Sequence, residues 1–261
     1  FVIVMFIDVH CHLDYKNYGD ISALIKRCAE QGVARIITVG FDVPSSRLAA
    51  EIAEAHEGVY FTAGFHPTEL SKYKDGDLKI IAGLCAHPKC VALGEIGLDY
   101  HYPDTQKELQ REVFIAQLEL ADSLKMPVQI HSRDCAEDML CLLSEKKHLL
   151  KNGALMHCYS HSTEMAEEFL KLGLSFSFGG ASTWKSNKKA KRTLAILPLE
   201  SILTETDSPY MPPASVYGTF PNTPLAIPEI CNCVADIKGL TPETVQNAVM
   251  ENARKLFKKL G

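Results

Sequence analysis

The sequence of 261 residues lacks a long apolar run, an interdomain linker and an excess of positive charge. Residues 1–4 are apolar, but Asp8 soon interrupts the run, and a membrane span needs about 20 apolar residues. No stretch rich in proline, glycine or serine and no long charge run divides the chain, which favours one domain. The formal net charge of -5 excludes a protein that wraps nucleic acid over its whole surface, so any nucleic-acid contact must be local.

The cysteines lack the spacing of a disulfide framework. They number nine, are scattered and follow no signal peptide, so we expect reduced thiols in a cytoplasmic protein. Cys231 and Cys233 are close together but lack the partners of a zinc site. If Met5 is the natural start, residues 1–4 are upstream or added sequence, and we expect a single domain over residues 5–261.

Short apolar segments alternate with longer segments of helical periodicity along the chain. Such short segments are typical of strands buried on both faces of a parallel sheet that helices cover. We expect strands near residues 6–12, 35–40, 59–65, 91–95, 127–131, 154–157, 174–178 and 202–207, with helices between them. This pattern predicts an α/β fold, a single (β/α)8 TIM barrel. An open doubly wound sheet is the alternative, but no Gly-x-Gly-x-x-Gly follows the first strand.

Side chains that can bind metals stand at the carboxyl ends of most of these strands. His10 and His12 share a face of the first strand, because side chains two apart in a strand point the same way. On its own this pair is as often a hydrogen-bonded polar pair as a metal site. Other predicted strands end in Glu95, His131, His157 and Asp207.

The carboxyl ends of barrel strands meet at one mouth, so these six side chains would share one pocket. Each has an ordinary structural explanation when taken singly, but the joint pattern favours a metal site. Six ligands are too many for one tetrahedral ion, and a carboxylate can bridge two cations. We therefore predict two ions bridged by Glu95, one completed by His10, His12 and Asp207 and the other by His131 and His157.

A two-metal site of this kind predicts hydrolysis. Two cations lower the pKa of a shared water and stabilise the charge that grows on a substrate oxygen. Asp207 is the candidate base that takes the proton from that water, and Glu95 is catalytic as the bridge. Histidine and carboxylate ligands accommodate zinc, manganese, magnesium, cobalt or nickel, so these residues do not select the metal.

Several segments carry motifs that occur together in one known family. They are Ile7 to Leu13, Gly64 to Pro67, Gly94 to Tyr100, His131 to Arg133, His157 to Ser160, Glu205 to Tyr210 and Asn252 to Phe257. On these motifs the chain resembles, essentially from end to end, the TatD family of metal-dependent deoxyribonucleases in the amidohydrolase superfamily. The resemblance implies a barrel, two divalent cations at the six residues with Glu95 bridging, and hydrolysis of DNA phosphodiester bonds, commonly as a 3′-5′ exodeoxyribonuclease.

Two departures from the family pattern bear on the substrate. His161 stands where the family usually has glycine, and we expect its side chain to point to solvent rather than to lie over the metal pocket. After Pro209 the family usually carries Arg-Gly-x-Arg-Asn-x-Pro, whereas residues 217–224 contain neither arginine. This absence favours an alternative, a binuclear-metal amidohydrolase that acts on a small ester, amide or phosphoester. A metal-stabilised binding protein without turnover is a rival from another class.

Two candidate substrate-binding residues follow strands directly. Arg133 could bind a phosphate through its forked guanidinium, or it could pair with surface carboxylates. His66 could face the mouth as a hydrogen-bond donor, or it could pack against Pro67.

Three further candidates lie late in the chain. Trp184 and Lys185 precede a basic helix and could hold a single-stranded or frayed 3′ end of DNA, although a solvated helix face is the simpler explanation. Glu205 shares a predicted strand face with Asp207, so we expect it to support Asp207 or to contact the substrate.

Overall fold

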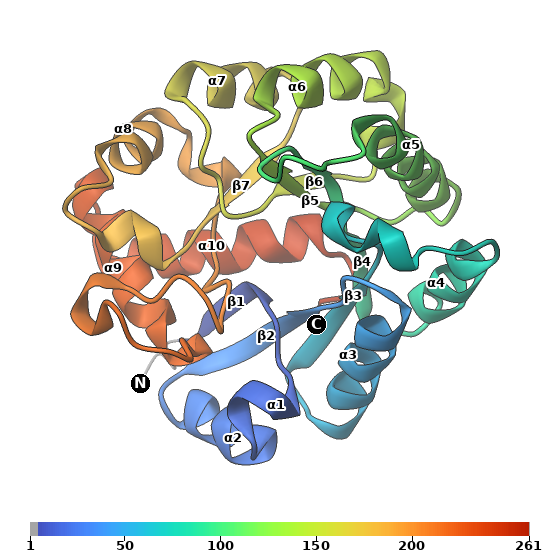
Figure 1. Cartoon of the computed structure of the whole chain (residues 1–261). Helices are drawn as coiled ribbons and strands as arrows, with labels where there is room; N and C mark the ends of the chain where they lie inside the picture. Colours follow the sequence, from blue (N-terminus) through green and yellow to red (C-terminus); the bar gives the residue numbers. More distant parts are fainter. Residues whose placement is uncertain (1–4, 261) are drawn as a thin grey trace.

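The computed structural model describes residues 5–260. The predicted status of residues 1–4 as upstream or added sequence lies outside the described residues. At the centre is an eight-stranded parallel sheet in which each strand pairs with the next along the chain (Figure 1). The strands are β1 (Phe6–Cys11), β2 (Val33–Val39), β3 (Val59–Ala63), β4 (Cys90–Asp99), β5 (Val128–Arg133), β6 (Ala154–Met156), β7 (Ser175–Phe178) and β8 (Ile202–Thr204).

The sheet closes where the segment after β8 meets β1. The backbone N–H of Asp207 donates to the carbonyl oxygen of His10 at 2.9 Å, and the N–H of His12 donates to that of Ser208 at 2.7 Å. These bonds join the last part of the sheet to the first, and the predicted (β/α)8 barrel is confirmed.

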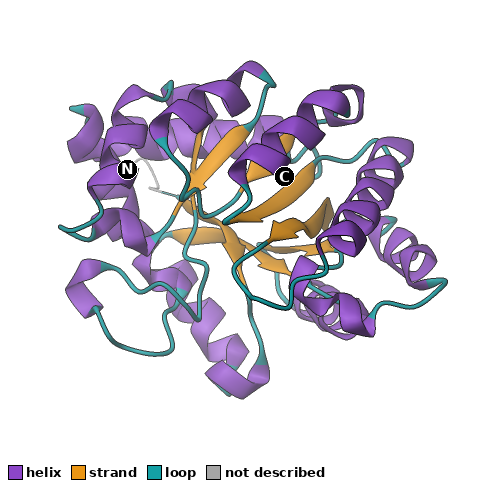
Figure 2. Cartoon of the chain, turned by 45° about the horizontal axis from the view of Figure 1, so that its top comes forward, coloured by secondary structure: helices purple, strands orange, loops and turns teal. Residues whose placement is uncertain are grey.

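Helices connect the strands and form an outer layer around the sheet (Figure 2). They are α1 (Tyr15–Tyr18), α2 (Ile21–Glu30), α3 (Val43–Ala55), α4 (Asp77–Cys85), α5 (Lys107–Ser123), α6 (Ala136–Glu145), α7 (Thr163–Lys171), α8 (Lys188–Ile196), α9 (Ile227–Lys238) and α10 (Pro242–Leu256). Short 3-10 segments are η1 (Pro67–Lys72), η2 (Lys147–Leu150), η3 (Gly180–Thr183), η4 (Leu199–Ser201), η5 (Ala214–Val216) and η6 (Pro224–Ala226). Among the described helices, none has the length and apolar character that crossing a membrane requires.

The final helix, α10, covers the end of the barrel where the strands begin. The side-chain amide of Asn252 donates to the carbonyl oxygens of Leu199 and Ile202, at 2.8 and 2.9 Å, beside the first residue of β8. The helix also contacts β1 and passes behind the strands in the view of Figure 1. The carboxyl ends of the strands are therefore left as the open end of the barrel.

Two strands end at residues other than those predicted. β4 continues past Glu95 to Asp99, because its last residues pair with β5. β8 ends at Thr204, and Asp207 beyond it has a positive φ of 51°, which no extended strand adopts. The prediction that Glu205 and Asp207 share a strand face is therefore wrong.

Candidate metal centre

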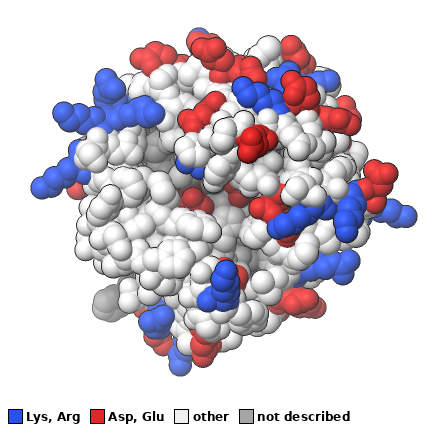
Figure 3. All heavy atoms as spheres, viewed as in Figure 1, with Lys and Arg blue, Asp and Glu red and all other residues white. Residues whose placement is uncertain are grey.

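All six predicted metal ligands come together at the open end of the barrel. They are His10 in β1, His12 just after β1, Glu95 in β4, His131 in β5, His157 just after β6 and Asp207 beyond β8. A cavity of about 1020 Å³ opens over them, and Figure 3 shows it as a hollow with carboxylate groups inside. His10 is fully buried, and the other five side chains line the cavity.

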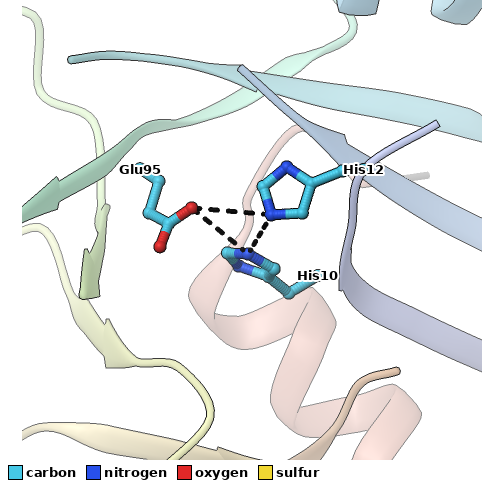
Figure 4. A group of neighbouring side chains, drawn as sticks. All are labelled: His10, His12 and Glu95. Atoms are coloured by element: carbon cyan, nitrogen blue, oxygen red, sulfur yellow. Dashed lines mark hydrogen bonds and ion pairs between the residues drawn. The ribbon is translucent and has the colours of Figure 1, made fainter. Parts of the chain in front are cut away.

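The first group of ligand atoms contains two imidazole nitrogens and two carboxylate oxygens. The Nε2 atoms of His10 and His12 are 3.4 Å apart. Glu95 Oε2 lies 3.6 Å from the first of these nitrogens and 3.7 Å from the second (Figure 4). Asp207 Oδ1 lies 3.7 and 3.6 Å from the same two atoms. Ligands of a tetrahedral ion at roughly 2.1 Å are about 3.4 Å from one another, so this spacing fits a divalent cation.

The second group uses the other oxygen of Glu95. Its Oε1 lies 2.9 Å from His131 Nδ1 and 2.8 Å from His157 Nε2, and these two nitrogens are 3.2 Å apart. Neighbouring ligands of a six-coordinate ion at roughly 2.1 Å are about 3.0 Å from each other. This group therefore also has the spacing of cation ligands, although the same atoms are close enough for hydrogen bonds.

In the first group, the outer nitrogen of each imidazole lies against a hydrogen-bond acceptor. His10 Nδ1 is 2.9 Å from the side-chain oxygen of Gln129, and His12 Nδ1 is 3.2 Å from the carbonyl oxygen of Val39. Such an acceptor keeps the proton on Nδ1 and leaves the lone pair of Nε2 free for a cation. The surroundings thus select the tautomer that a metal requires.

Carboxylates lie behind the imidazoles of the second group. His131 Nε2 is 3.0 Å from Asp99 Oδ2, within hydrogen-bond distance, whereas His157 Nδ1 is 3.7 Å from Glu205 Oε1, which is close enough for an ion pair but too far for a hydrogen bond. A carboxylate behind a metal-binding imidazole orients the ring and makes it a stronger ligand. Three of the four imidazoles, those of His10, His12 and His131, therefore have the hydrogen-bonded outer partner that metal sites in proteins commonly have.

The charges in the cluster favour bound positive charge. Burial alone would raise the pKa of Glu95, but neighbouring imidazoles, above all His157, hold it well below its usual range. Burial alone would lower the pKa of His157, but the carboxylates of Glu95 and Glu205 hold it well above its usual range. Burial also raises the pKa of Asp207, but the hydrogen bond from His12 and nearby imidazoles lower it overall. The ionised carboxylates thus attract protons to the imidazoles, and a divalent cation can replace those protons.

The structure brings two of the five candidate substrate-binding residues to the cavity. His66, just after β3, and Arg133, the last residue of β5, both line it. His66 Nε2 lies 3.3 Å from Glu95 Oε1, and burial lowers the pKa of this imidazole, so it is neutral at pH 7. The side chain of Arg133 is exposed at the cavity, whose lining also contains the carboxylates of Glu95, Asp99 and Asp207.

The other three candidates lie outside the cavity. Glu205 has no exposed surface and contacts His157 and Ser177, so a direct contact with substrate does not fit its position. Trp184 is partly buried, and its indole N–H donates to a backbone carbonyl at 2.9 Å. Lys185 is exposed and lines a separate pocket with residues of α8 and α9. Neither Trp184 nor Lys185 reaches the cavity.

His161 does not point to solvent, so that prediction is wrong. Its Nε2 is 2.7 Å from the hydroxyl of Ser132, and its ring centroid is 5.8 Å from that of Tyr159 and 6.4 Å from that of Phe169. Burial lowers the pKa of His161 to about 4. The neutral ring shares a hydrogen bond with the hydroxyl of Ser132 and packs against the two aromatic rings.

The sequence reasoning misses three buried polar residues that support the cluster. Asp99 and Gln129 contact the imidazoles, and Asp8 accepts hydrogen bonds from the N–H of Thr206, at 3.0 Å, and from its hydroxyl. Asp8 therefore ties β1 to the segment that carries Asp207, and burial raises its pKa to about 8. A signal existed for Asp8 and Gln129, because each is a polar residue inside a strand predicted to be buried on both faces.

Comparison with known proteins gives concordant matches over almost the whole chain. A family model described as TatD related DNase matches residues 7–258. The "Uncharacterized metal-dependent hydrolase YabD" of Bacillus subtilis is 37% identical over 255 residues, which are 97% of this chain and 99% of that protein. The "3'-5' ssDNA/RNA exonuclease TatD" of Erwinia billingiae is 32% identical, over 92% of this chain and 93% of the relative. The crystal structure of YjjV, a TatD homologue from Escherichia coli K12, has a TM-score of 0.93 and 32% identity, over 98% of this chain and 99% of that one.

Proposed function

The chain belongs to the TatD-related DNase family and is a metal-dependent hydrolase, and from this premise we propose that it cleaves DNA phosphodiester bonds with two divalent cations. We propose further that it works as a 3′-5′ exodeoxyribonuclease on a single-stranded or frayed 3′ end. The name of the Erwinia relative, a 3'-5' ssDNA/RNA exonuclease, supports this polarity.

The observation that carries the proposal is the position of the Glu95 carboxylate. Its Oε2 faces the imidazoles of His10 and His12, whereas its Oε1 faces those of His131 and His157. A carboxylate whose two oxygens belong to two separate ligand groups is suited to bridge two cations. The histidine and carboxylate ligands suit zinc, manganese, magnesium, cobalt and nickel.

The side chains around the bridge have distinct proposed roles. Two bound cations would lower the pKa of a water between them and stabilise negative charge on a phosphate oxygen. Asp207 is ionised, because the imidazoles hold its pKa low, and it accepts the proton of the attacking water. His66 and Arg133 line the cavity and donate hydrogen bonds to the oxygens of the scissile phosphate.

A second candidate function is hydrolysis of a small ester, amide or phosphoester in the same pocket. The residues from 208 to 226, which follow β8, include no lysine or arginine to hold a DNA backbone. The cavity of about 1020 Å³ can also enclose a small molecule. The two candidates share the metal chemistry and differ only in substrate, so one experiment separates them.

The test uses a 5′-labelled single-stranded oligonucleotide and chelated protein that has been reloaded in turn with zinc, manganese and magnesium. We expect a ladder that shortens from the 3′ end, and two metal ions per chain by inductively coupled plasma mass spectrometry. Glu95→Ala should abolish the ladder and lower the metal content. Glu167→Ala, which replaces an exposed glutamate in α7, is the matched control and should behave as wild type.

The contrary outcomes point to different conclusions. An intact oligonucleotide beside hydrolysis of a simple phosphoester would favour the second candidate. Full metal occupancy without hydrolysis of any substrate would indicate a metal-stabilised binding protein. A single ion per chain, unaffected by Glu95→Ala, would contradict the bridging role.

We also propose that residues 5–261 act as one domain in the cytoplasm. All nine cysteines are free thiols, which suits a reducing compartment. Cell fractionation with an antibody against the protein tests the location.

A further inference from the structure

The exposed aromatic side chains of the protein gather at the open end of the barrel. Within residues 5–260, the aromatic side chains with more than half of their surface exposed are Tyr15, Tyr102, Tyr210, Tyr217 and Phe220. Tyr15 follows β1, Tyr102 follows β4, and the other three follow β8. All five therefore lie in the connections after strand carboxyl ends, where the candidate metal centre is.

Exposed apolar residues elsewhere on the described surface are of a different kind. Leu124, Ile196 and Leu240 are aliphatic, and each lies at or just beyond the end of a helix that leads back to the start of a strand or of α10. Isolated exposed aliphatic residues are normal on a protein surface, whereas a group of exposed aromatic residues beside a pocket marks a binding surface.

Three of the aromatic residues belong to a segment without charge. The residues from 208 to 226 include no lysine, arginine, aspartate or glutamate, and five of them are prolines. In Figure 3, a broad uncharged area adjoins the hollow on the side of α9. Because proline fixes its own φ angle, a segment so rich in proline has few alternative conformations.

Hydrogen bonds hold this segment in place. The side-chain amide of Asn222, which is buried, donates to the carbonyl oxygen of Tyr210 at 2.8 Å, and its backbone N–H donates to that of Pro209 at 2.9 Å. The indole N–H of Trp184 donates to the carbonyl oxygen of Pro212 at 2.9 Å. The backbone is thus anchored while the aromatic rings stay exposed, which lowers the entropy cost of binding a ligand to them.

The aromatic rings continue outward from the cavity. Tyr102 and Tyr210 are themselves part of the cavity lining. The ring of Phe220 lies 6.3 Å from that of Tyr210, and the ring of Tyr217 lies 5.3 Å from the indole of Trp184. A flexible chain whose end reached the metal centre would therefore pass over exposed rings as it left the cavity.

Positive charge at the mouth is limited. Lys16 and Arg133 are the only lysine and arginine among the described residues that line the cavity. These two side chains can neutralise only a few phosphates, so their phosphate contacts alone would give a nucleic acid little affinity. Stacking on aromatic rings supplies affinity without charge, because every base has an aromatic face.

We propose that the aromatic surface, defined as Tyr102, Tyr210, Tyr217 and Phe220, stacks against the unpaired bases of single-stranded nucleic acid. The protein then recognises its substrate through the bases more than through the phosphates. This inference rests on the proposed nuclease function and states how that same site holds its substrate. The occupant is single-stranded because bases inside a duplex present their faces to each other rather than to a protein.

The test measures coupling between Phe220 and the bases of the substrate. Steady-state kinetics are compared for a single-stranded oligonucleotide and for the same oligonucleotide with abasic residues near its 3′ end. Wild type and Phe220→Ala are assayed on both substrates, with Phe220→Tyr as the conservative variant and Ile196→Ala as an exposed apolar control outside the mouth. The salt dependence of KM is measured in parallel.

We expect Phe220→Ala to raise KM for the normal oligonucleotide about 5- to 150-fold, the effect of losing one stacked base. It should have almost no effect on KM for the abasic substrate, Phe220→Tyr should restore KM, and Ile196→Ala should match wild type. The slope of log affinity against log salt should be no steeper than about -1.4, the value for two phosphate contacts with a single strand.

The results that would overturn the inference differ from those that would overturn the nuclease function. Equal effects of Phe220→Ala on both substrates would mean that the aromatic surface does not stack against bases. A steeper salt slope would mean that phosphate contacts contribute more than base contacts to recognition. Either result would leave the nuclease function standing. No hydrolysis of either oligonucleotide by metal-loaded wild type would refute the nuclease function itself.

Discussion

Replacing Gln129 by methionine should weaken metal binding by the His10, His12 and Asp207 group while the barrel still folds. The side chain of Gln129 has no exposed surface, and its oxygen accepts a hydrogen bond from Nδ1 of His10 at 2.9 Å. Its amide nitrogen donates to the carbonyl oxygen of Val9 at 2.9 Å. Methionine keeps the length and approximate volume of glutamine but can make neither bond.

The size of the effect follows from what the lost bonds do. Loss of the outer partner of a metal-binding imidazole lowers metal affinity about 10- to 100-fold, or about 1.4 to 2.7 kcal/mol. The buried ring Nδ1–H of His10 loses its acceptor, which costs about 1–3 kcal/mol. The carbonyl of Val9 also loses one donor. A domain with a typical stability of roughly 5–15 kcal/mol would still fold, although it would unfold at lower urea concentration.

The assay is competition for zinc against a coloured chelator, together with urea unfolding of the metal-free protein. Gln117→Met is the matched control, because Gln117 is an equally buried glutamine whose side chain bonds to the backbone of Phe65 and to no imidazole. We expect both variants to lose stability and Gln129→Met alone to lose metal affinity. Wild-type affinity in Gln129→Met, or an equal loss in both variants, would refute the idea that Gln129 prepares His10 for a metal.

Three further predictions test other parts of the site. Asp207→Asn should keep the fold by circular dichroism but lower kcat about 10²- to 10⁴-fold, the usual contribution of a general base, and a wild-type rate would exclude Asp207 from that role. Asp99→Ala should lower metal affinity of the group containing His131 about 10- to 100-fold in the same competition assay, because that imidazole loses its carboxylate partner, and unchanged affinity would contradict this. The pKa of His161 is about 4 in the folded protein against an ordinary value of 6.5, so its contribution to stability is complete above pH 6.5 and is lost as the pH falls towards 4. Between pH 7 and pH 5, urea unfolding of the metal-free protein should therefore show a loss that is about 2 kcal/mol smaller for His161→Gln than for wild type, and equal losses would refute the assignment.

The six candidate ligands were predictable because, in a barrel, residues at the carboxyl ends of different strands lie around the same opening. Alternation along a strand placed His10 and His12 on one face, and the carboxyl ends of parallel strands placed Glu95, His131 and His157 at the same mouth. The partners behind the imidazoles were harder to predict. Gln129 reaches His10 across the barrel, a contact between residues far apart in the sequence that no local pattern contains.

The strand ends show the same division between local pattern and tertiary contact. A local apolar run marks that a strand exists, but pairing with a neighbour decides where it stops. β4 runs on to Asp99 because its last residues pair with β5, and this extension brings the Asp99 carboxylate against His131. β8 stops early, and the buried Glu205 lies near His157 and does not line the cavity.

By itself, the sequence determined the barrel, its open end and the six side chains at the candidate metal centre, because each depends on periodicity and on the order of strands. Only the tertiary structure decided which oxygen of Glu95 faces which imidazoles, which carboxylates lie behind those rings, and where the exposed aromatic residues gather. Those features depend on distances between residues remote in the chain, which packing and hydrogen bonding set only when the sheet closes.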